Sequence, residues 1–280
     1  MEVNPIDRMR CMTSPLNLPA GAADCHAHVL RTDLPLVAGR HSAPLRHAEV
    51  DEYLRVLDAH GIRYGVLTAP SFYGNDNRLL LRSLQAAGGR LRGTAIVEPE
   101  IGDADLDGLY AHGVRGVRLN WLRRQPLPDS GSRAYRALYP RLRERGMHVE
   151  VYVEGEHLAA VLPPILASGV RLVLDHFGGL TPGFSTLGLL REALAQGQTW
   201  IKLSAPYRLA GQDAAALTAL LLREAGAQRL LWGTDWPWVS NESEVDYARC
   251  LGWLGEWLPD PGPRDIILRD TPRLLFDFED

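Results

Sequence analysis

The sequence predicts a single-domain (β/α)8 TIM-like barrel. Five times along the chain a helix-like stretch ends at a glycine and a short β-rich run follows almost at once; the glycines are Gly61, Gly113, Gly146, Gly169 and Gly226. A glycine just past a helix end can adopt the left-handed conformation that closes the helix. Helices alternating with strands predict βα units and a parallel sheet. Eight such units in a chain of 280 residues match the usual size of this barrel.

The strands are expected at short β-rich runs such as IRYGVLTAP, VRGVRLN, MHVEVYV and RLVLDHF. In order, they cover residues 22–29, 64–68, 92–97, 116–120, 148–153, 171–175, 199–203 and 229–233. The helices between and after them are expected over residues 50–60, 77–87, 103–112, 132–144, 158–168, 185–195, 214–224 and 245–257. Residues 1–20 are expected to form an extended arm, and residues 21–280 the barrel. The alternative is a doubly wound open sheet, but the first strand lacks the glycine-rich phosphate turn that such a sheet usually carries.

The composition is ordinary for a soluble globular protein, with 46% hydrophobic and 23% charged residues. The formal net charge is -4 and the basic residues form no runs, so neither nucleic acid nor a membrane is an expected partner. The three cysteines lack metal-binding spacing, and we find no secretory signal or membrane-spanning run, which favours a cytoplasmic setting. Assembly into a homo-oligomer stays open. Lys202 is the only lysine.

Polar residues gather at the carboxyl ends of the expected strands, where the active sites of such barrels lie. They are Asp24, His26 and His28 on the first strand, Arg118 and Asn120 on the fourth with Arg124 after it, Glu150, Tyr152 and Glu154 on the fifth, Asp175 and His176 on the sixth, Lys202 and Ser204 on the seventh with Arg208 after it, and Asp235 after the eighth. Ionisable residues within or ending strands are unusual in a packed core. The pattern therefore indicates a functional site at this rim.

Some candidates have a plain structural interpretation. His60 and His112 lie at helix C-termini and His148 begins a strand, so hydrogen bonds within the fold are expected to account for all three. Trp253 and Trp257 lie four residues apart and are expected to pack their helix.

Residue parity along the first and sixth strands predicts which side chains face the barrel centre. Asp24 shares the parity of the two histidines but lies deeper, so a supporting hydrogen bond to a neighbouring strand or histidine is expected. Cys25 is expected to point away from the barrel centre as a small buried hydrophobe. Asp175 has the opposite parity to His176 and is expected to orient a loop.

The H-x-H pair of His26 and His28 is one beginning of a metal site. A catalytic zinc site generally needs a third protein ligand and an open position, and His176 and Asp235 would complete a mononuclear site. Arg118, however, occupies a strand end where a further ligand is common, and arginine keeps its proton. We therefore expect no metal; one divalent ion such as zinc on the two histidines, His176 and Asp235 is the alternative. Without a metal, the histidines can polarise a carbonyl oxygen by hydrogen bonding.

Three arginines are expected at the mouth of the barrel. Arg118, Arg124 and Arg208 make a poor environment for a cation and a good one for carboxylates, because each guanidinium can hold a carboxylate by two charged hydrogen bonds. For Arg124 and Arg208, a solvated loop position is an equal alternative. The expected ligand is therefore an anion.

Six motifs lie in order along nearly the whole chain: DCHAHVL, SFYGNDN, RGVRLNWLRR, LDHFG, IKLSAPYRL and WGTDWP. Together they resemble the 2-pyrone-4,6-dicarboxylate lactonase-like family of the amidohydrolase superfamily. The resemblance implies a distorted (β/α)8 barrel that hydrolyses a lactone carrying carboxylate groups. It also implies chemistry without a metal, as in the best-known member.

The resemblance implies roles for individual residues of this chain. His26, His28 and His176 would polarise the lactone carbonyl, and Asp235 would activate water. The residues that would bind the substrate are Arg118, Arg124, Arg208, Tyr152, Ser71 and Asn120.

The chain departs from the family pattern at two positions. Gly179 stands where an arginine is usual, and Trp238 stands where a histidine is usual. The family's substrate-binding tyrosine after the first strand has no clear match, and His41, Arg46 and His47 lie in that loop.

The expected function is therefore hydrolysis of a carboxylate-bearing lactone, of the 2-pyrone-4,6-dicarboxylate or sugar-acid type, by water attack on the ester carbonyl. One alternative is a mononuclear metal-dependent amidohydrolase or decarboxylase of the same fold. The other is a non-catalytic ligand-binding barrel, since a fold does not determine a function.

Overall fold

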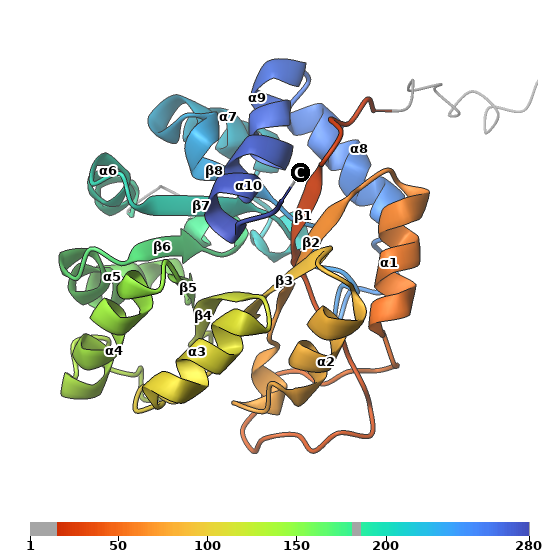
Figure 1. Ribbon diagram of the computed structural model, residues 1–280. Helices are drawn as coiled ribbons and strands as arrows, with labels where there is room; N and C mark the ends of the chain where they lie inside the picture. The colour runs from red at the N-terminus through yellow and green to blue at the C-terminus, as the bar shows by residue number, and fades with distance from the viewer. Residues whose placement is uncertain (1–15, 181–185, 280) are drawn as a thin grey trace, which may run out of the picture.

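Eight parallel strands lie side by side in chain order, and helices surround them (Figure 1). The computed structural model describes residues 16–180 and 186–279. The strands are β1 Ala23–Ala27, β2 Tyr64–Thr68, β3 Leu91–Ala95, β4 Val114–Asn120, β5 His148–Tyr152, β6 Arg171–Leu174, β7 Thr199–Leu203 and β8 Leu230–Trp232. The ring is completed just past β8, where Asp235 N donates to His26 O (2.8 Å) and His28 N donates to Trp236 O (2.7 Å). The predicted (β/α)8 barrel is confirmed.

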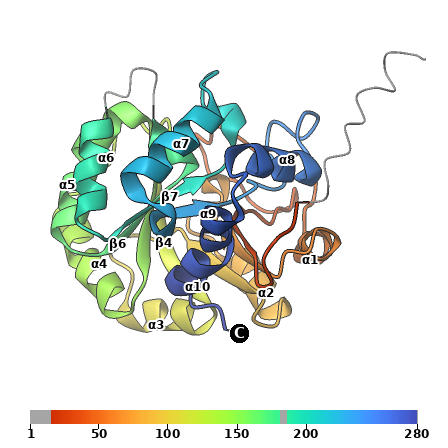
Figure 2. The same ribbon diagram turned by 90° about the horizontal axis from the view of Figure 1, so that it is seen from above.

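One helix follows each strand on the outside of the ring, as the second view also shows (Figure 2). These helices are α1 Val50–Ala59, α2 Arg78–Ala86, α3 Asp103–Ala111, α4 Arg133–Glu144, α5 Leu158–Ala167, α6 Leu187–Ala195, α7 Ala214–Ala225 and α8 Tyr247–Trp257. The five glycines that predicted helix ends all have positive φ, between 68° and 90°. The expected start of α8 at residue 245 is two residues early, because the Asp246 side chain caps the helix by accepting from Arg249 N (2.7 Å).

The chain continues past the last expected helix into three short elements that the sequence reasoning missed. They are α9 Pro261–Asp265, a π-helical turn at Ile266–Asp270 and α10 Thr271–Phe276. Phe276 and Phe278 then pack with buried residues of the strands, and they contact the rings of His148 and Tyr64, which begin β5 and β2. The C-terminal segment therefore covers the amino ends of the strands and leaves the carboxyl ends as the open face.

The expected N-terminal arm over residues 1–20 falls mostly outside the described residues. Within its described part, Leu16 and Leu18 pack against the hydrophobic core. No helix of the described residues has both the length and the apolar character needed to cross a bilayer.

A bulge in β1 changes which side chains enter the barrel. The register with β2 shifts between Asp24 and Ala27. Cys25, expected to point away from the barrel centre, packs instead inside it with Val66 and Leu231. Asp24 points out toward α8, because Tyr247 of that helix donates to its Oδ2 (3.3 Å). An extra residue in one strand breaks strict alternation, so the parity prediction was wrong for these two positions.

Hydrogen bonds and packing within the fold account for His60, His112, Trp253 and Trp257, as expected. His60 and His112 bond to backbone carbonyls through Nδ1 (2.8 and 2.7 Å). Trp253 and Trp257 stack along α8. His148 differs in its partners: it is fully buried inside the barrel, with Nε2 3.5 Å from Thr94 Oγ1 and 3.7 Å from Glu150 Oε2.

Candidate active site

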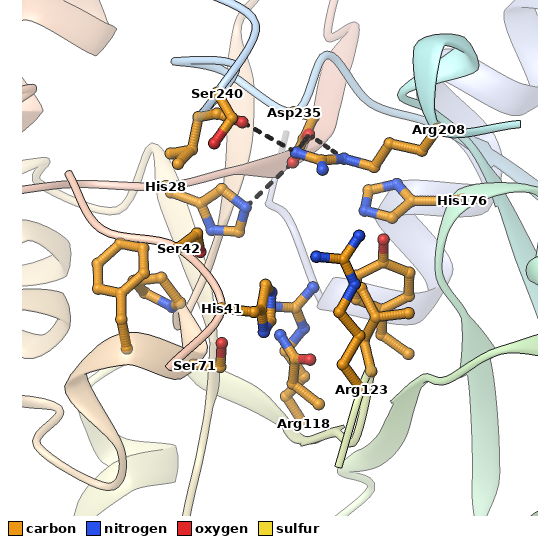
Figure 3. Close-up of a pocket in the computed structure, with 16 residues that line it drawn as sticks. His28, His41, Ser42, Ser71, Arg118, Arg123, His176, Arg208, Asp235 and Ser240 are labelled. Carbon is orange, nitrogen blue, oxygen red and sulfur yellow. Dashed lines mark hydrogen bonds and ion pairs between the residues drawn. The ribbon is translucent and has the colours of Figure 1, made fainter. Parts of the chain in front are cut away.

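A cavity of about 170 Å³ opens at the carboxyl ends of the strands (Figure 3). It combines histidines, guanidinium groups and one buried carboxylate with small polar side chains. Its lining residues are His28, His41, Ser42, Pro70, Ser71, Phe72, Arg118, Asn120, Leu122, Arg123, Tyr152, His176, Arg208, Asp235, Val239 and Ser240. Seven of the fifteen polar residues predicted from the strand ends therefore line this one cavity.

Asp235 is the buried carboxylate of this cavity, with an exposed fraction of 2%. Arg208 donates to its Oδ2 from Nε (3.1 Å) and Nη2 (2.8 Å), and Tyr207 donates to the same oxygen (2.7 Å). Burial raises the pKa of Asp235, but the Arg208 charge lowers it by more, so the pKa lies well below its usual range. Asp235 is therefore ionised. Tyr207 was missed by the sequence reasoning, although it directly precedes Arg208.

His28 points its Nε2 toward Asp235, and in the neutral ring this nitrogen carries no proton. Its Nδ1 lies 2.6 Å from the Thr68 carbonyl oxygen, which can only accept, so Nδ1 carries the ring proton. Its Nε2 lies 3.1 Å from Asp235 Oδ1. Two acceptors face each other when the ring is neutral, so this position attracts one positive charge, either a proton or a metal cation.

His26 is fully buried between the cavity and the barrel core. Its Nδ1 lies 3.1 Å from Lys202 Nζ and 3.2 Å from Asp175 Oδ1, and its Nε2 lies 3.6 Å from Asp235 Oδ1. Nε2 has no hydrogen-bond partner among the described residues. Burial and then the Lys202 charge lower the pKa of His26 to about 4, so the ring is neutral at pH 7.

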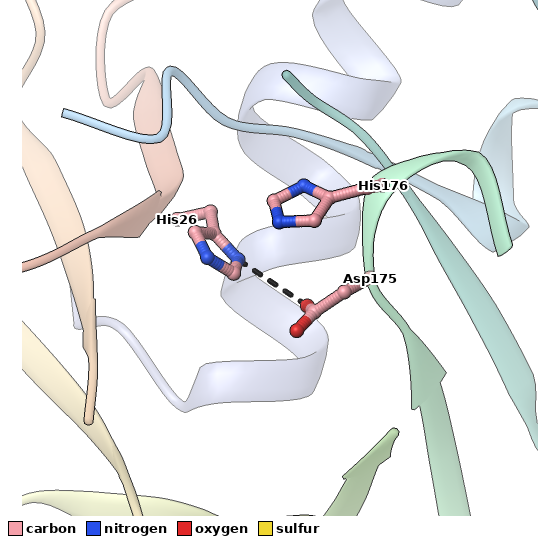
Figure 4. Close-up of side chains that lie close together, drawn as sticks. All are labelled: His26, Asp175 and His176. Atoms are coloured by element: carbon pink, nitrogen blue, oxygen red, sulfur yellow. Dashed lines mark ion pairs between the residues drawn. The ribbon is translucent and has the colours of Figure 1, made fainter. Parts of the chain in front are cut away.

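His176 lies beside His26 just after β6 (Figure 4). Its Nδ1 bonds to Ser204 Oγ (2.8 Å), and its ring contacts Tyr152 edge to face, with ring centroids 4.7 Å apart. Its φ of 46° is in the left-handed region, which is uncommon for a residue other than glycine. Burial lowers the pKa of His176 well below its usual range, so this ring is neutral too.

Below the cavity, four charged side chains form a buried network that the sequence reasoning recognised only in part. Arg118 Nη2 donates to Asp175 Oδ2 (2.8 Å), and Lys202 Nζ donates to Glu150 Oε2 (2.6 Å) and lies 3.2 Å from Asp175 Oδ1. All four side chains are at most 3% exposed. The expected loop-orienting role of Asp175 is therefore wrong: it is an ion-pair partner in the barrel centre.

The three arginines expected to bind a substrate carboxylate differ in whether they line the cavity. Arg118 and Arg208 line the cavity, but each already contacts a carboxylate of the protein. Arg124 is exposed and does not line the cavity, whereas its neighbour Arg123 does. Nothing in the sequence distinguishes the two adjacent arginines; the left-handed backbone at Arg123 (φ 58°) is a property of the folded loop.

The smaller polar residues are placed as expected. Ser71, Asn120 and Tyr152 all line the cavity. Burial raises the pKa of Tyr152 to about 12, so its hydroxyl keeps its proton at neutral pH. His41 also lines the cavity from the loop after β1.

Both departures from the family pattern have a structural context. A Cβ atom on Gly179 would lie 3.0 Å from the Val153 carbonyl oxygen, and Gly179 has φ of 62°, so this backbone leaves no room for an arginine. The Trp238 indole donates to the Thr234 carbonyl oxygen (3.1 Å) and so braces the loop that carries Asp235.

Two groups of side chains in the described part of the chain have the composition of a metal site. One is His26, His28 and Asp235, and the other is His26, Asp175 and His176. In each group the ligand atoms lie within 4.8 Å of one another. Three of the four residues of the sequence alternative, His26, His28 and Asp235, thus form a set that could hold one divalent ion, whereas His176 falls in the other group.

Comparison with known proteins identifies the family of the chain. Residues 23–278 match the amidohydrolase family model. The chain is 30% identical over 283 residues to a 2-pyrone-4,6-dicarboxylate hydrolase of Comamonas testosteroni (92% of this chain, 91% of the relative). It is 27% identical to a 4-sulfomuconolactone hydrolase of Rhizobium radiobacter (98% and 96%). The crystal structure of a probable 2-pyrone-4,6-dicarboxylic acid hydrolase from Acinetobacter baumannii with citric acid bound superposes with a TM-score of 0.85 at 28% identity (92% and 100%). The chain belongs to the amidohydrolase family.

Proposed function

We propose that the protein hydrolyses a lactone bearing at least one carboxylate, of the 2-pyrone-4,6-dicarboxylate or sugar-acid type. The observation that carries this proposal is the pairing of two facing acceptors, His28 Nε2 and Asp235 Oδ1, inside a cavity lined by three guanidinium groups. The acceptor pair can take a proton from water, and the guanidinium groups can hold an anionic substrate. The named relatives support it, because they act on lactones and one related structure holds citric acid, a tricarboxylate.

The base in this mechanism is the Asp235–His28 pair. Water adds to the lactone carbonyl carbon while its proton moves into the position between Oδ1 and Nε2, where it relieves the contact between two acceptors. The tetrahedral intermediate then collapses, the ring C–O bond breaks, and the proton passes to the departing oxygen. A carboxylic acid and a hydroxyl, or its keto tautomer, result.

The developing oxyanion needs hydrogen-bond donors near the base. His26 and His176 supply them, since both are neutral, buried and adjacent, with ring centroids 4.7 Å apart. Donors placed in advance around a developing charge stabilise the transition state more than they would in water. His28, expected to act with these two, is directed at Asp235 instead and serves the base.

A metal-dependent amidohydrolase or decarboxylase is the second candidate, favoured by the same facing acceptors. The ion would be held by His26, His28 and Asp235 and would supply Lewis-acid polarisation of an oxygen. The residues fit a divalent cation poorly, because Arg208 already contacts Asp235 and Lys202 already contacts His26. Fixed positive charges beside two of the three ligands favour a proton over a doubly charged ion.

Protein purified without added metal should accordingly contain well below one equivalent of tightly bound divalent ion, and chelation should leave lactonase activity unchanged. Elemental analysis, with assays before and after chelator treatment, measures both. A stoichiometric ion that is removed together with activity, and restores it when returned, would make the metal-dependent mechanism the correct one.

Turnover should require a free carboxylate on the lactone, and Arg123 should matter where Arg124 does not. A hydrogen bond to a charged group contributes about 1.5–3 kcal/mol, or roughly 10- to 100-fold in kcat/KM. The measurement is kcat/KM for matched carboxylated and neutral lactones with wild type, Arg123→Ala and Arg124→Ala. Arg124→Ala is the matched control, because it removes the same charge one residue away, outside the cavity. Equal values for both lactones would contradict the carboxylate requirement.

A further inference from the structure

Lys202 is the one lysine of the chain, and it lies fully buried beneath the cavity rather than on the surface. It does not line the cavity. Its three nearest polar neighbours are Glu150, Asp175 and His26, at 2.6, 3.2 and 3.1 Å from Nζ. An ammonium group has three protons, so each of these neighbours is a potential acceptor.

In the contact with His26, Lys202 can only be the hydrogen-bond donor. An ammonium donates and never accepts, so the His26 Nδ1 that meets Lys202 must present its lone pair. Asp175 Oδ1 lies 3.2 Å from Nδ1, but it also lies 3.2 Å from Lys202 Nζ, and the ammonium can donate to it without a proton from the imidazole. In a neutral imidazole the proton then resides on Nε2, the atom that faces the Asp235 end of the site and has no partner among the described residues.

The charges around Lys202 keep this arrangement in place. Lys202 and Arg118 balance Glu150 and Asp175, two positive groups against two negative ones, all buried. Burial lowers the pKa of Lys202, but the two carboxylates raise it by more, so the ammonium keeps its protons.

We propose that Lys202 is a positioning residue that selects the tautomer of His26 with the proton on Nε2, so that this ring donates a hydrogen bond into the active site. The consequence of this tautomer, a hydrogen-bond donor for the oxyanion of the opening lactone, rests on the proposed function. The tautomer itself is a property of the resting protein and can be measured without any substrate.

The test is ¹⁵N NMR of the imidazole nitrogens in the full-length protein, since a protonated and an unprotonated ring nitrogen resonate at distinct positions. His26→Gln assigns the His26 signals by their loss. We expect wild-type His26 to have an unprotonated Nδ1 and a protonated Nε2. Because the chain has a single lysine, ¹⁵N-lysine labelling gives one side-chain resonance, and we expect it to correlate with His26 Nδ1.

The variant Lys202→Met/Glu150→Gln removes the donor while keeping the core charge balanced between Arg118 and Asp175. The matched control is Glu150→Gln alone, which keeps the ammonium. In the double variant His26 should transfer its proton to Nδ1, with Asp175 Oδ1 as acceptor, and kcat should fall about 100-fold with KM little changed. The control should keep the wild-type tautomer.

A proton on Nδ1 in the wild type, or an unchanged tautomer in the double variant, would overturn the proposal. If the tautomers behave as expected while the wild type hydrolyses no carboxylated lactone, the assignment of Lys202 stands and the proposed function fails. The two failures are thus distinguishable.

Discussion

Replacing Asp235 with asparagine should lower kcat for lactone hydrolysis by at least about 100-fold, the lower end expected for loss of a general base. The carboxylate Oδ1 faces Nε2 of His28 at 3.1 Å, and this nitrogen is an acceptor when the ring is neutral. An asparagine amide would place an N–H in that position and donate to His28, so the site that receives the proton from water would be filled. The change keeps the size of the side chain, so KM and thermal stability should change much less than kcat.

The control for this variant is Tyr207→Phe, which removes a neutral donor to the other oxygen of the same carboxylate. Without that hydrogen bond the pKa of Asp235 should rise, because the ionised form loses a partner. Activity should survive, with the acidic limb of the pH–rate profile moved to higher pH. Both variants should be followed by steady-state kinetics across pH. Wild-type kcat in folded Asp235→Asn would remove this residue from the mechanism and transfer the role of base to Glu154 or a rim histidine.

Much of the fold was predictable because its units are local. Five helix ends are marked by a glycine whose positive φ the structure confirms, and each strand is marked by a short β-rich run. The C-terminal elements after Trp257 were not predictable in the same way. They are short, interrupted by prolines, and held by packing of Phe276 and Phe278 against the amino ends of the strands.

The site was predictable where a residue ends a strand of the barrel. His28, His176 and Asp235 follow this rule, and they line one cavity. The rule fails where local geometry departs from a regular strand. The bulge in β1 brings Cys25 inward, and Asp175 turns into the barrel centre immediately after β6 ends. No periodicity in the sequence encodes either departure, because each depends on contacts with other strands.

Loops were the second source of error, for the same reason. Adjacent arginines in the loop after β4 are equivalent in sequence and both are exposed, yet only Arg123 lines the cavity. Hydrogen bonding from its own backbone N to Glu154 Oε1 (2.8 Å) helps to place Arg123. A carboxylate on a neighbouring loop thus helps to determine which arginine lines the cavity, and that contact exists only in the folded chain.

Asp175→Asn should destabilise the protein by about 3–5 kcal/mol, the cost expected when one partner of a buried ion pair is removed. The carboxylate lies between Arg118 and Lys202, and the variant leaves these two positive charges against Glu150 alone. The control is Asp103→Asn, which removes an exposed partner of Arg141 and Arg145 on the barrel surface and should change stability little, because solvent screens such pairs. Denaturant unfolding at neutral pH measures both variants.

The effect of Asp175→Asn should also depend on pH, with a sign set by the direction of the pKa shift. Burial raises the pKa of Asp175, but the Lys202 and Arg118 charges lower it by more, so the folded pKa lies well below the usual value. A carboxylate whose folded pKa is depressed adds stability in full above its unfolded pKa, about 3.9, and loses it as the pH falls toward the folded value. The stability difference between wild type and Asp175→Asn should therefore be constant from pH 7 down to about pH 5 and shrink below about pH 4. A difference of similar size at pH 3 and pH 7 would mean that Asp175 stabilises the barrel through its shape and hydrogen bonds rather than through its charge.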